Sequence, residues 1–517
     1  MLLSPRVFFL FLLCWIAWIP CGSAQIVGPV PSPFESIQQN SVSTMEALGD
    51  TLWIGPGLNR AINNNQQWYY PEDAEKIVND QGRVFSLALA PDTVWAGLGY
   101  NVQTNSGSVQ AGLGYHYSTD GGNSWNYIEN PNEEEVDTSF VYGGVTYTKL
   151  PVTAQEQSPP FDVAMNGNTV FSASWALGLV RSHDFGQSWQ RIILPPQQAD
   201  SLVPENEYAF TADGANRYDP RYDQNLLGFS VLIDNQGRVW CGTAGGINIS
   251  ENALTAPADS IRWQHIQIDG TENGLLGNWI ITIKQQPSTG DIWMTNWPAG
   301  LDSNEQYGVV RTSNGGQTFD RYLQGERIND IGFSNGTIWA AGNNGLFKSS
   351  DNGTNWTKLP RIGSPNTFIK ESAQYYSIAK TRHRVWIGTS DGLASTHDNG
   401  RNWKITRVNF PLSGQNRYQQ DAPSVDAYAY PNPFSPRRHN LVRIKYEIQE
   451  AGNVKIRLFD FGMNLIRELD SGNFSSGTYE AVWNGLDGQG NQVANGPVFY
   501  QIDTPDNTIR GKILVID

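Results

Sequence analysis

Two polar segments of the chain carry most of the side chains that could do acid–base chemistry. Glu133 and Glu135 lie in residues 129–160, and Glu205 and Glu207 lie in residues 195–226. Glycoside hydrolysis uses such paired carboxylates, one as an acid and one as a base or nucleophile. The same oxygen atoms could hold a calcium ion, and charged loops are often simply solvated. A catalytic pair, a calcium site and a solvated loop therefore all remain open.

Aromatic and amide side chains form a second set, which could hold a ligand without reacting with it. A Trp at the tip of a loop can stack on a sugar ring or on an aromatic peptide side chain, or it can cover apolar surface of its own repeat. No histidine pair has the spacing of a metal site, and no Gly-x-Ser-x-Gly, Walker or dinucleotide-binding motif occurs in a suitable context. The candidates for ligand binding are Tyr100, Asn101, Trp175, Arg217, Tyr218, Asn296 and Trp297.

The elements that position these residues are indicated by a repeated phrase, Ser/Thr-x-Asp-x-Gly-x-x-Trp. Its Asp can accept hydrogen bonds from the backbone of a hairpin turn, its Gly can adopt a positive φ, and its Trp can anchor the next strand. We therefore expect a structural role for these residues. A weaker copy covers residues 312–319, and an eroded one covers 61–68. The clear copies contain Asp120 and Trp125, Asp184 and Trp189, Asp351 and Trp356, and Asp398 and Trp403.

This phrase resembles the Asp-box, or BNR, repeat of sialidase-like and sortilin-like β-propellers, where it joins the two outer strands of a blade. Photosystem II assembly-factor-like propellers share the repeat and bind protein. The resemblance implies a fold but no particular activity. Sialidases also carry an Arg-Ile-Pro motif near the first blade, and this chain has none; its nearest string, Arg361-Ile362-Gly363, lies near the end of the repeats.

A second repeat gives the number of blades. Seven apolar-aromatic-small clusters begin at residues 52, 94, 170, 239, 292, 338 and 385, each preceded by another apolar strand. Four short strands about every 45 residues are typical of a propeller. We therefore predict a seven-bladed β-propeller within residues 25–412. The two polar segments would be connections between blades 2 and 3 and between blades 3 and 4, rising from the top face around the central channel.

Composition indicates the compartment. Residues 1–24 have an apolar run followed by Gly22-Ser23-Ala24, which predicts a secretory signal peptide. Cys241 is then the only cysteine of the mature chain, so no internal disulfide is expected. The formal net charge of -15 argues against nucleic acid as a partner. No later segment is long and apolar enough for a transmembrane helix, which needs about 20 residues.

The end of the chain predicts a separate domain. Residues 413–425 read as a linker, and 426–517 contain alternating strands separated by hairpin turns, which suits an Ig-like β-sandwich. Tyr430-Pro431-Asn432-Pro433-Phe434 and Trp483-Asn484-Gly485-Leu486-Asp487 resemble the Ig-like domain first recognised in the flagellar hook-capping protein FlgD. Such C-terminal domains in the Bacteroidetes act as sorting signals for type IX secretion. The resemblance therefore implies a role in export or surface attachment.

The sequence thus predicts an all-β chain, a seven-bladed β-propeller followed by a C-terminal Ig-like β-sandwich. The favoured function is a secreted or cell-surface bacterial protein that binds a glycan or a protein on its top face and has no catalytic activity or cofactor. The alternative is a sialidase-like glycoside hydrolase that uses the carboxylates of the two polar segments.

Overall fold

The computed structural model describes residues 37–61, 68–69, 71, 82–104, 107–210, 216–300, 304–408 and 425–517. The predicted signal peptide, linker residues 413–424 and most of the eroded repeat copy lie outside the described residues. Within these ranges almost all regular structure is β, and the α-helix that the structure shows, α2 (Pro436–His439), has a single turn. No helix among the described residues is long and apolar enough to cross a membrane.

Seven consecutive antiparallel meanders of four strands make up the larger domain over the part of the chain that is described. Blade 1 contains β1 (Met45–Leu48), β2 (Thr51–Ile54), β3 (Asn59–Ala61) and β4 (Trp68–Tyr69). Blade 2 contains β5 (Arg83–Ala90), β6 (Thr93–Thr104), β7 (Gly107–Ser118) and β8 (Asn126–Ile128). Blade 3 contains β11 (Pro160–Asn166), β12 (Thr169–Ser174), β13 (Gly178–Ser182) and β14 (Gln190–Ile192).

Blade 4 contains β17 (Gly228–Ile233), β18 (Val239–Thr243), β19 (Ile247–Ser250) and β20 (Trp263–Ile266), with β15 (Ser201–Leu202) added at its outer edge. Blade 5 contains β21 (Trp279–Gln285), β22 (Ile292–Trp297), β23 (Gly308–Thr312) and β24 (Asp320–Tyr322). Blade 6 contains β25 (Ile328–Ser334), β26 (Thr337–Gly342), β27 (Gly345–Ser349) and β28 (Thr357–Lys358). Blade 7 contains β31 (Tyr375–Lys380), β32 (Val385–Thr389), β33 (Gly392–Thr396) and β34 (Lys404–Thr406).

The first strands of the blades form a closed ring. Each contacts the first strand of the next blade, in the order β1, β5, β11, β17, β21, β25, β31 and back to β1. Each predicted apolar-aromatic-small cluster lies on the second strand of its blade, so that its apolar residues face the neighbouring blades. The predicted fold class, an all-β propeller with a C-terminal sandwich, is confirmed.

A bulge near the start of the first strand recurs in blades 2 to 7. The residue after each bulge is Ser, Thr or Asp, and its side chain bonds to the backbone of the next blade. These bonds satisfy backbone groups that would otherwise be buried without a partner between two sheets. The bonds run from Ser86 Oγ to Pro160 O (2.8 Å), from Val231 N to Asp162 Oδ2 (2.9 Å), from Ser230 Oγ to Ile280 O (2.9 Å), from Thr282 Oγ1 to Asn329 O (2.9 Å), from Ile378 N to Asp330 Oδ2 (2.8 Å), and from Ser377 Oγ to Val42 O (3.2 Å).

The ring closes between blades 7 and 1 through a short N-terminal segment, residues 40–42. Val42 N donates to Thr389 O (3.0 Å), and Gly392 N donates to Asn40 O (2.7 Å). The Asn40 side chain also accepts a hydrogen bond from Val408 N at 2.9 Å. All four described strands of blade 1 come from the N-terminal part of the propeller sequence, and all four of blade 7 come from its C-terminal part. This junction, the ring seam, therefore has no strand shared between the two ends of the propeller in the described structure.

The repeated Ser/Thr-x-Asp-x-Gly-x-x-Trp segments lie between the third and fourth strands of their blades. Asp120 Oδ1 accepts hydrogen bonds from the backbone N–H groups of Asn123 and Ser124, both at 2.9 Å. Gly122 has a φ of 90°, which a residue with a Cβ rarely adopts. Each Trp of the clear copies meets, edge to face, the cluster Trp of the preceding blade. The ring centroids lie 5.6 Å apart for Trp125 and Trp53, 6.3 Å for Trp189 and Trp95, 6.4 Å for Trp356 and Trp293, and 6.2 Å for Trp403 and Trp339.

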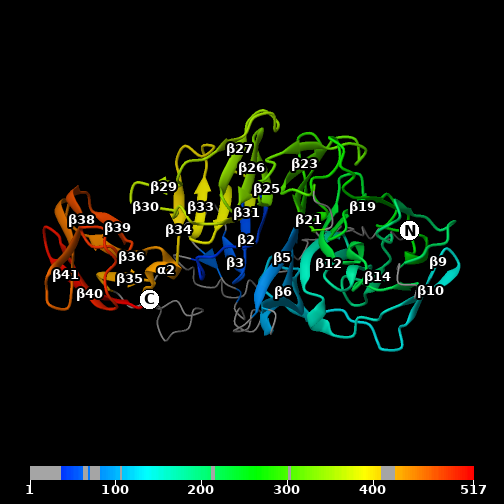
Figure 1. The fold of residues 1–517 in the computed structure, drawn as a ribbon, viewed down its shortest axis with the longest axis horizontal. Coiled ribbons are helices and arrows are strands. Elements are labelled where there is room, and N and C mark those ends of the chain that lie inside the picture. The colour runs from blue at the N-terminus through cyan, green and yellow to red at the C-terminus, as the bar shows by residue number, and fades with distance from the viewer. Residues whose placement is uncertain are drawn as a thin grey trace, which may run out of the picture.

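The two polar segments fold onto each other rather than around the channel. β9 (Ser139–Tyr142), β10 (Val145–Lys149) and β16 (Arg217–Tyr218) form a separate three-stranded sheet. Figure 1 shows β9 and β10 at the end of the molecule that lies far from the C-terminal domain. Tyr142 Oη donates to Ile261 O at 2.7 Å, which ties this sheet to the outer edge of blade 4. The prediction that both segments rise around the channel is therefore wrong.

The physical reason is an aromatic core that the two segments share. Phe140 and Tyr147 of the first segment pack against Phe210 and Tyr218 of the second, with ring centroids 5.1 to 5.5 Å apart. Burying these rings against one another and against the rim of blades 3 and 4 removes a large apolar area from water. Short 3₁₀ turns at η1 (Gln155–Gln157) and η2 (Gln224–Leu226) lie in the two segments, and η3 (Ala258–Ser260) lies between β19 and β20 of blade 4.

The C-terminal domain is a sandwich of two antiparallel sheets. One sheet has the order β35 (Ala427–Tyr430), β36 (Val442–Ile448), β39 (Gly477–Trp483). The other has the order β38 (Leu465–Phe474), β37 (Gly452–Phe459), β40 (Gly496–Asp503), β41 (Thr508–Val515). Alternate residues such as Val454, Ile456 and Leu458 fill the core between the sheets.

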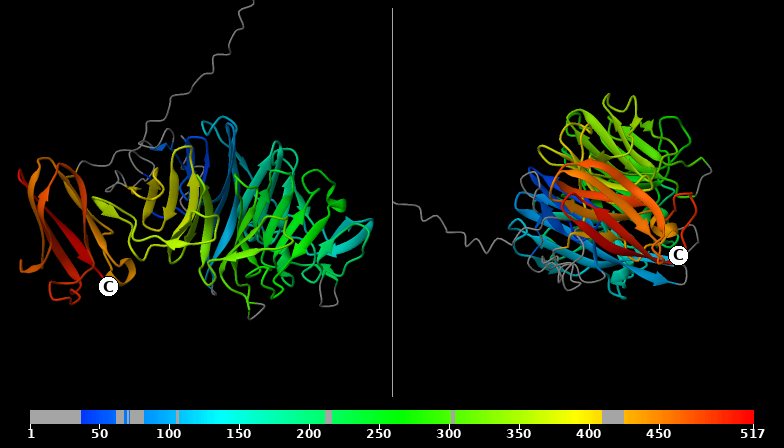
Figure 2. Two further views of the ribbon diagram at one scale, coloured as in Figure 1. Left: turned by 90° about the horizontal axis from the view of Figure 1, so that it is seen from above. Right: turned by 90° about the vertical axis from the view of Figure 1, so that its left-hand side faces the viewer.

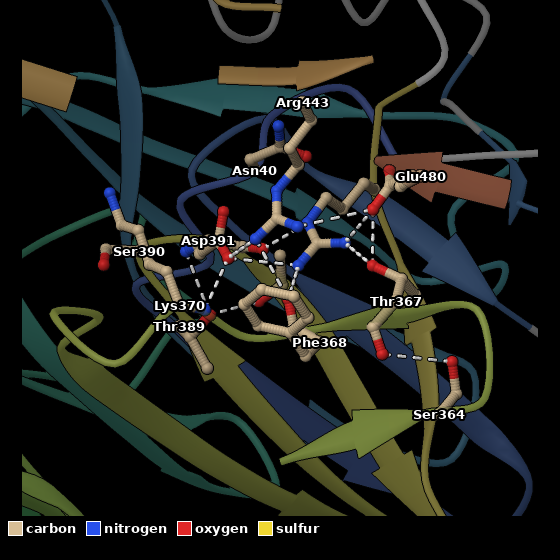
Figure 3. Close-up of polar contacts among 12 residues, drawn as sticks. Asn40, Ser364, Thr367, Phe368, Lys370, Thr389, Ser390, Asp391, Arg443 and Glu480 are labelled. Carbon is tan, nitrogen blue, oxygen red and sulfur yellow. Dashed lines mark hydrogen bonds and ion pairs between the residues drawn. The ribbon is translucent and has the colours of Figure 1, made fainter. Parts of the chain in front are cut away.

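Four buried charges join this domain to blade 7, and we call them the junction network: Arg407, Asp391, Arg443 and Glu480 (Figure 3). Each domain contributes one arginine and one carboxylate. Arg443 is 2% exposed and lies 2.6 Å from Asp391 Oδ2, while Arg407 lies 3.0 Å from both carboxylates. A hairpin of β29 (Gly363–Ser364) and β30 (Thr367–Phe368) reaches from the connection before blade 7 to this network, and both arginines donate to Phe368 O. In Figure 2 the C-terminal domain lies beside blade 7.

Candidate functional site

The carboxylates predicted for catalysis do not converge. Glu133 is buried, accepts a hydrogen bond from Val152 N at 2.9 Å, and pairs with Lys149 and with Arg191 Nη1 (3.0 Å). This arrangement uses both of its oxygens and holds the first polar segment on blade 3. A carboxylate so engaged has no free oxygen for a substrate or for a metal ion.

The other predicted carboxylates are exposed. Glu205 pairs with Arg262 at the outer edge of blade 4, and Glu135 and Glu207 lie on the surface of the two segments. Among the described residues, no group of three or more His, Cys, Asp or Glu side chains is arranged to hold a metal ion. Within the described part of these segments, the structure therefore provides no geometric support for a catalytic pair or a calcium site.

Three of the predicted ligand-binding residues are engaged in contacts within the fold. Arg217 pairs with Asp219 at 2.7 Å on the outer rim. Tyr218 is buried in the aromatic core of the two segments, where burial raises its pKa to about 12. Asn296 is also buried, and its Oδ1 accepts a hydrogen bond from Leu276 N at 2.8 Å. Tyr218 and Asn296 are therefore withdrawn from the surface, whereas the Arg217 side chain remains 35% exposed beside Asp219.

Of the remaining candidates, Trp297 lines the central channel, whereas Tyr100, Asn101 and Trp175 lie outside its lining. Trp175 follows β12 and Trp297 ends β22, both half-buried. Tyr100 and Asn101 lie on the extended end of β6, where Asn101 pairs with Gln110 of β7. Gln110 and Trp297 both line the channel cavity, whose volume is about 830 Å³. A volume of this size lies within the range of about 300–1,000 Å³ typical of ligand pockets.

A row of aromatic side chains, which the sequence analysis missed, connects these candidates. Phe85, Phe161 and Phe229 are the bulged residues of three successive first strands, and their ring centroids are 6.4 and 5.8 Å apart. Trp175 and Trp279 both lie against Phe229, at 5.4 and 5.2 Å. All five are half-buried, and we call them the aromatic row. One sequence signal could have found the three Phe residues: each precedes the Ser or Asp that bonds to the next blade.

The other side of the mouth is polar. Asn329, Asn343, Gln374 and Tyr376 line it, and Tyr376 Oη donates to Gln374 Oε1 at 3.0 Å. Trp297 continues the aromatic row, because it pairs directly with Trp279 across β21 and β22. The mouth therefore presents aromatic surface on one side and amide groups on the other.

Deeper in the channel, a salt bridge connects two blades that are not neighbours. Lys284 Nζ of β21 lies 2.7 Å from Glu46 Oε1 of β1. Burial alone would lower the pKa of Lys284, but Glu46, Asp330 and Asp162 outweigh that effect and raise it above its usual value. Lys284 is therefore a protonated ammonium group and not a nucleophile.

Asp162 and Asp330 are the two other carboxylates of the channel. Burial raises the pKa of Asp162 to about 7 and that of Asp330 to about 6. Each accepts one backbone N–H of its own strand and one of the next blade, so that both oxygens are used for holding blades together. The geometry of the channel therefore suits binding at its mouth and does not show an acid and a base poised on either side of a bond.

The comparisons with known proteins agree with this architecture. Residues 442–504 match the FlgD Ig-like domain, which confirms the resemblance predicted for the C-terminal domain. No curated protein matches the chain in sequence. The fold and its channel define a β-propeller carrying a FlgD Ig-like domain.

Several solved structures are similar over most of the chain. One is PorZ, a surface component of the type IX secretion system of Porphyromonas gingivalis, at 15% identity and a TM-score of 0.38, covering 92% of this chain and 65% of PorZ. Another is an ancestral GH74 enzyme at 15% identity and a TM-score of 0.46, covering 94% of this chain and 63% of the enzyme. A third is YCF48 bound to D1 peptide, at 15% identity and a TM-score of 0.40, covering 74% and 100%. The chain thus spans less than two thirds of the length of the first and second of these.

Proposed function

We propose that this chain is a secreted or surface-displayed binding protein that holds a glycan at the mouth of its central channel. The observation that carries the proposal is the half-buried aromatic row, Phe85, Phe161, Phe229, Trp175 and Trp279, of which Phe85 and Phe161 line the channel cavity. Aromatic faces stack on the apolar faces of sugar rings, and amides opposite can bond to hydroxyl groups. The amides of Asn329, Asn343 and Gln374 occupy that opposite side.

The function is proposed to be binding without cleavage. Glu133 is held in a buried ion cluster and Glu205 pairs with an arginine on the rim, so neither of these two carboxylates is free, while Glu135 and Glu207 are exposed on the surface of the two segments. Asp162 and Asp330 are bonded to backbone N–H groups on both oxygens. A hydrolase would need an acid and a base or nucleophile facing one glycosidic bond.

Retention of the purified chain on insoluble plant and bacterial polysaccharides tests the proposal. We expect retention without release of new reducing ends, and loss of retention in Phe229→Ala and Trp175→Ala. Phe461→Ala is the matched control, because Phe461 is 79% exposed on the C-terminal domain and far from the mouth in sequence and in fold. Release of reducing ends that disappears in Glu133→Gln or Glu205→Gln would instead make the chain a hydrolase. Retention that is equal in all variants would place binding elsewhere, and no retention would direct attention to protein partners.

The C-terminal domain is proposed to serve export or attachment at the cell surface, as its resemblance to sorting domains implies. Fusing residues 426–517 to a reporter with a signal peptide, in a bacterium with type IX secretion, tests this role. We expect the reporter at the cell surface or in the medium. A reporter that stays in the periplasm would mean that the domain is an accessory sandwich only.

A further inference from the structure

Arg327 stands out among the arginines of the propeller because its guanidinium group has no polar partner. It forms no hydrogen bond or ion pair with any residue in the described part of the chain, and its Nε is buried without an acceptor. Three other arginines of the propeller that are half-buried or buried have acceptors. Arg191 has Glu133, Arg311 has Asp320, and Arg321 has the carbonyl oxygens of residues 274 and 275.

Aromatic rings fix the position of this side chain. The Arg327 guanidinium carbon lies 3.9 Å from the centroid of Trp297 and 5.8 Å from that of Tyr307. Trp297 is itself held by a hydrogen bond from its Nε1 to Ile328 O at 2.8 Å. Stacking uses the flat face of a guanidinium and leaves the N–H groups at its edge free to bind a planar anion. The cation is therefore already positioned before any ligand binds.

Arg327 also lies where a ligand on the aromatic row would end. It lines the same cavity as Phe85 and Phe161. Trp297 pairs with Trp279 of the row across β21 and β22, and Trp279 touches Phe229. A ligand stacked on the row would therefore meet the guanidinium at the blade 5 and blade 6 side of the mouth.

We propose that Arg327 is an anion-binding residue of the channel mouth, and that the glycan held there is acidic, with a uronic acid carboxylate on Arg327 and its sugar ring on the aromatic row. This inference rests on the proposed function. A carboxylate accepts two parallel N–H bonds from a guanidinium, which gives both affinity and orientation. Sugar hydroxyl groups would face Asn329, Asn343 and Gln374 on the opposite side.

The charge of the whole chain limits the kind of acidic glycan. With a net charge of -15, the protein repels a dense polyanion at long range. Arg327 can therefore select a carboxylate that is already in the mouth, but it cannot attract one from a distance. We expect short acidic oligosaccharides, or polymers with sparse acidic residues, to bind better than fully charged chains.

Calorimetric titration of residues 25–517 with trigalacturonate, and with its methyl ester, tests the inference. The ester keeps the same sugars and removes the charge. We expect the acid to bind at least about tenfold more tightly than the ester, and Arg327→Gln to abolish this difference without weakening the ester. Arg327→Lys keeps the positive charge but lacks the pair of parallel N–H groups, and should retain part of the preference for the acid over the ester. Arg437→Gln, in an exposed ion pair of the C-terminal domain, is the control.

The possible results separate the inference from the proposed function. Equal binding of acid and ester, with Arg327→Gln unchanged and Phe229→Ala weakened, would overturn the inference and leave the glycan-binding proposal intact. Glucuronate and mannuronate trimers are further arms of the experiment. A preference for any of these acids that depends on Arg327 would support the inference. If no glycan binds, and a peptide binds through its free carboxylate but not as its amide, both the glycan proposal and this inference fail.

Discussion

Lys284 and Glu46 meet inside the channel at 2.7 Å, although 238 positions separate them in the chain and their blades are not neighbours. At the same level of other first strands, Ala88, Ala164 and Gly332 are short, although blade 4 has Leu232 there. This leaves room for the lysine side chain to extend to the far wall. The pair connects blade 5 with blade 1 and gives the ring a contact that no neighbouring pair of blades provides.

Replacing Lys284 by Met leaves Glu46 without its cation and close to two further carboxylates. We expect the free energy of unfolding to fall by about 1–3 kcal/mol, the cost of leaving one partner of a half-buried pair alone. The double variant Lys284→Met, Glu46→Met should recover part of that loss. Chemical denaturation followed by tryptophan fluorescence measures both, and equal losses in the single and double variants would mean that the pair contributes no coupling.

The raised pKa values of Asp162, about 7, and Asp330, about 6, make stability depend on pH in a definite direction. Unfolded aspartate titrates near 4, so between pH 4 and 7 these two aspartates bind more protons in the folded chain than in the unfolded chain. These two groups therefore favour the fold at low pH, and this contribution is lost as the pH rises through their folded pKa values.

Asp162→Asn removes that dependence at one site. We expect the difference in unfolding free energy, variant minus wild type, to increase by about 1–3 kcal/mol as the pH rises from 4.5 to 8. Histidines such as His116, whose pKa burial lowers to about 4, act in the opposite direction in both proteins, so that only the difference between variant and wild type is informative. A difference that stays constant over this range would show that Asp162 titrates normally.

Substituting each of two tryptophans of blade 3 should distinguish an effect on stability from an effect on binding. Trp189 lies between blades, stacked on Tyr115 at 5.3 Å and against Trp95 at 6.3 Å. Trp189→Ala should cost about 3 kcal/mol of stability because it opens a gap between two sheets. Trp175→Ala in the aromatic row should cost less stability and reduce glycan retention. Thermal melting and the retention assay on both variants check this, and the reverse order of melting temperatures would contradict it.

The junction network predicts an unusual order of effects. Arg443→Leu removes one cation and leaves Asp391 and Glu480 with Arg407 alone, which is 5% exposed. The double variant Arg443→Leu, Glu480→Leu removes one charge of each sign and leaves the pair Arg407 and Asp391 intact in the propeller. We therefore expect the single variant to be the less stable of the two, because an uncompensated buried charge costs more than a missing pair.

Small-angle scattering and calorimetry distinguish these variants. In the double variant the C-terminal domain should separate from blade 7, with an increased radius of gyration and two melting transitions. A compact molecule with one transition would show that contacts outside the network hold the domains together.

The blades were predictable because their signals are local. The apolar-aromatic-small clusters coincide with β2, β6, β12, β18, β22, β26 and β32, and the alternating strands predicted within residues 426–517 are present, β36 and β39 among them. Each of these signals is a short stretch of alternating or apolar residues whose meaning does not depend on distant parts of the chain.

The site was predicted only in part, because its geometry is not local. Trp297 lines the channel and Trp175 lies against Phe229, but Phe85, Phe161 and Phe229 come together only when successive first strands become neighbours. The polar segments were misplaced for the same reason. The pairing of Phe140 with Phe210 across two insertions, which hides both from the surface, has no signature within either segment.

The C-terminal domain contacts the ring seam, so it can stabilise the closure of the propeller. Asn40 of the seam lines the same surface pocket as Tyr428 and Tyr430 of the C-terminal domain. Asp391, next to the seam residue Gly392, is held by that same arginine. The domain thus covers the junction between the first and last blades. A chain that ends before residue 426 should therefore unfold first between blades 7 and 1.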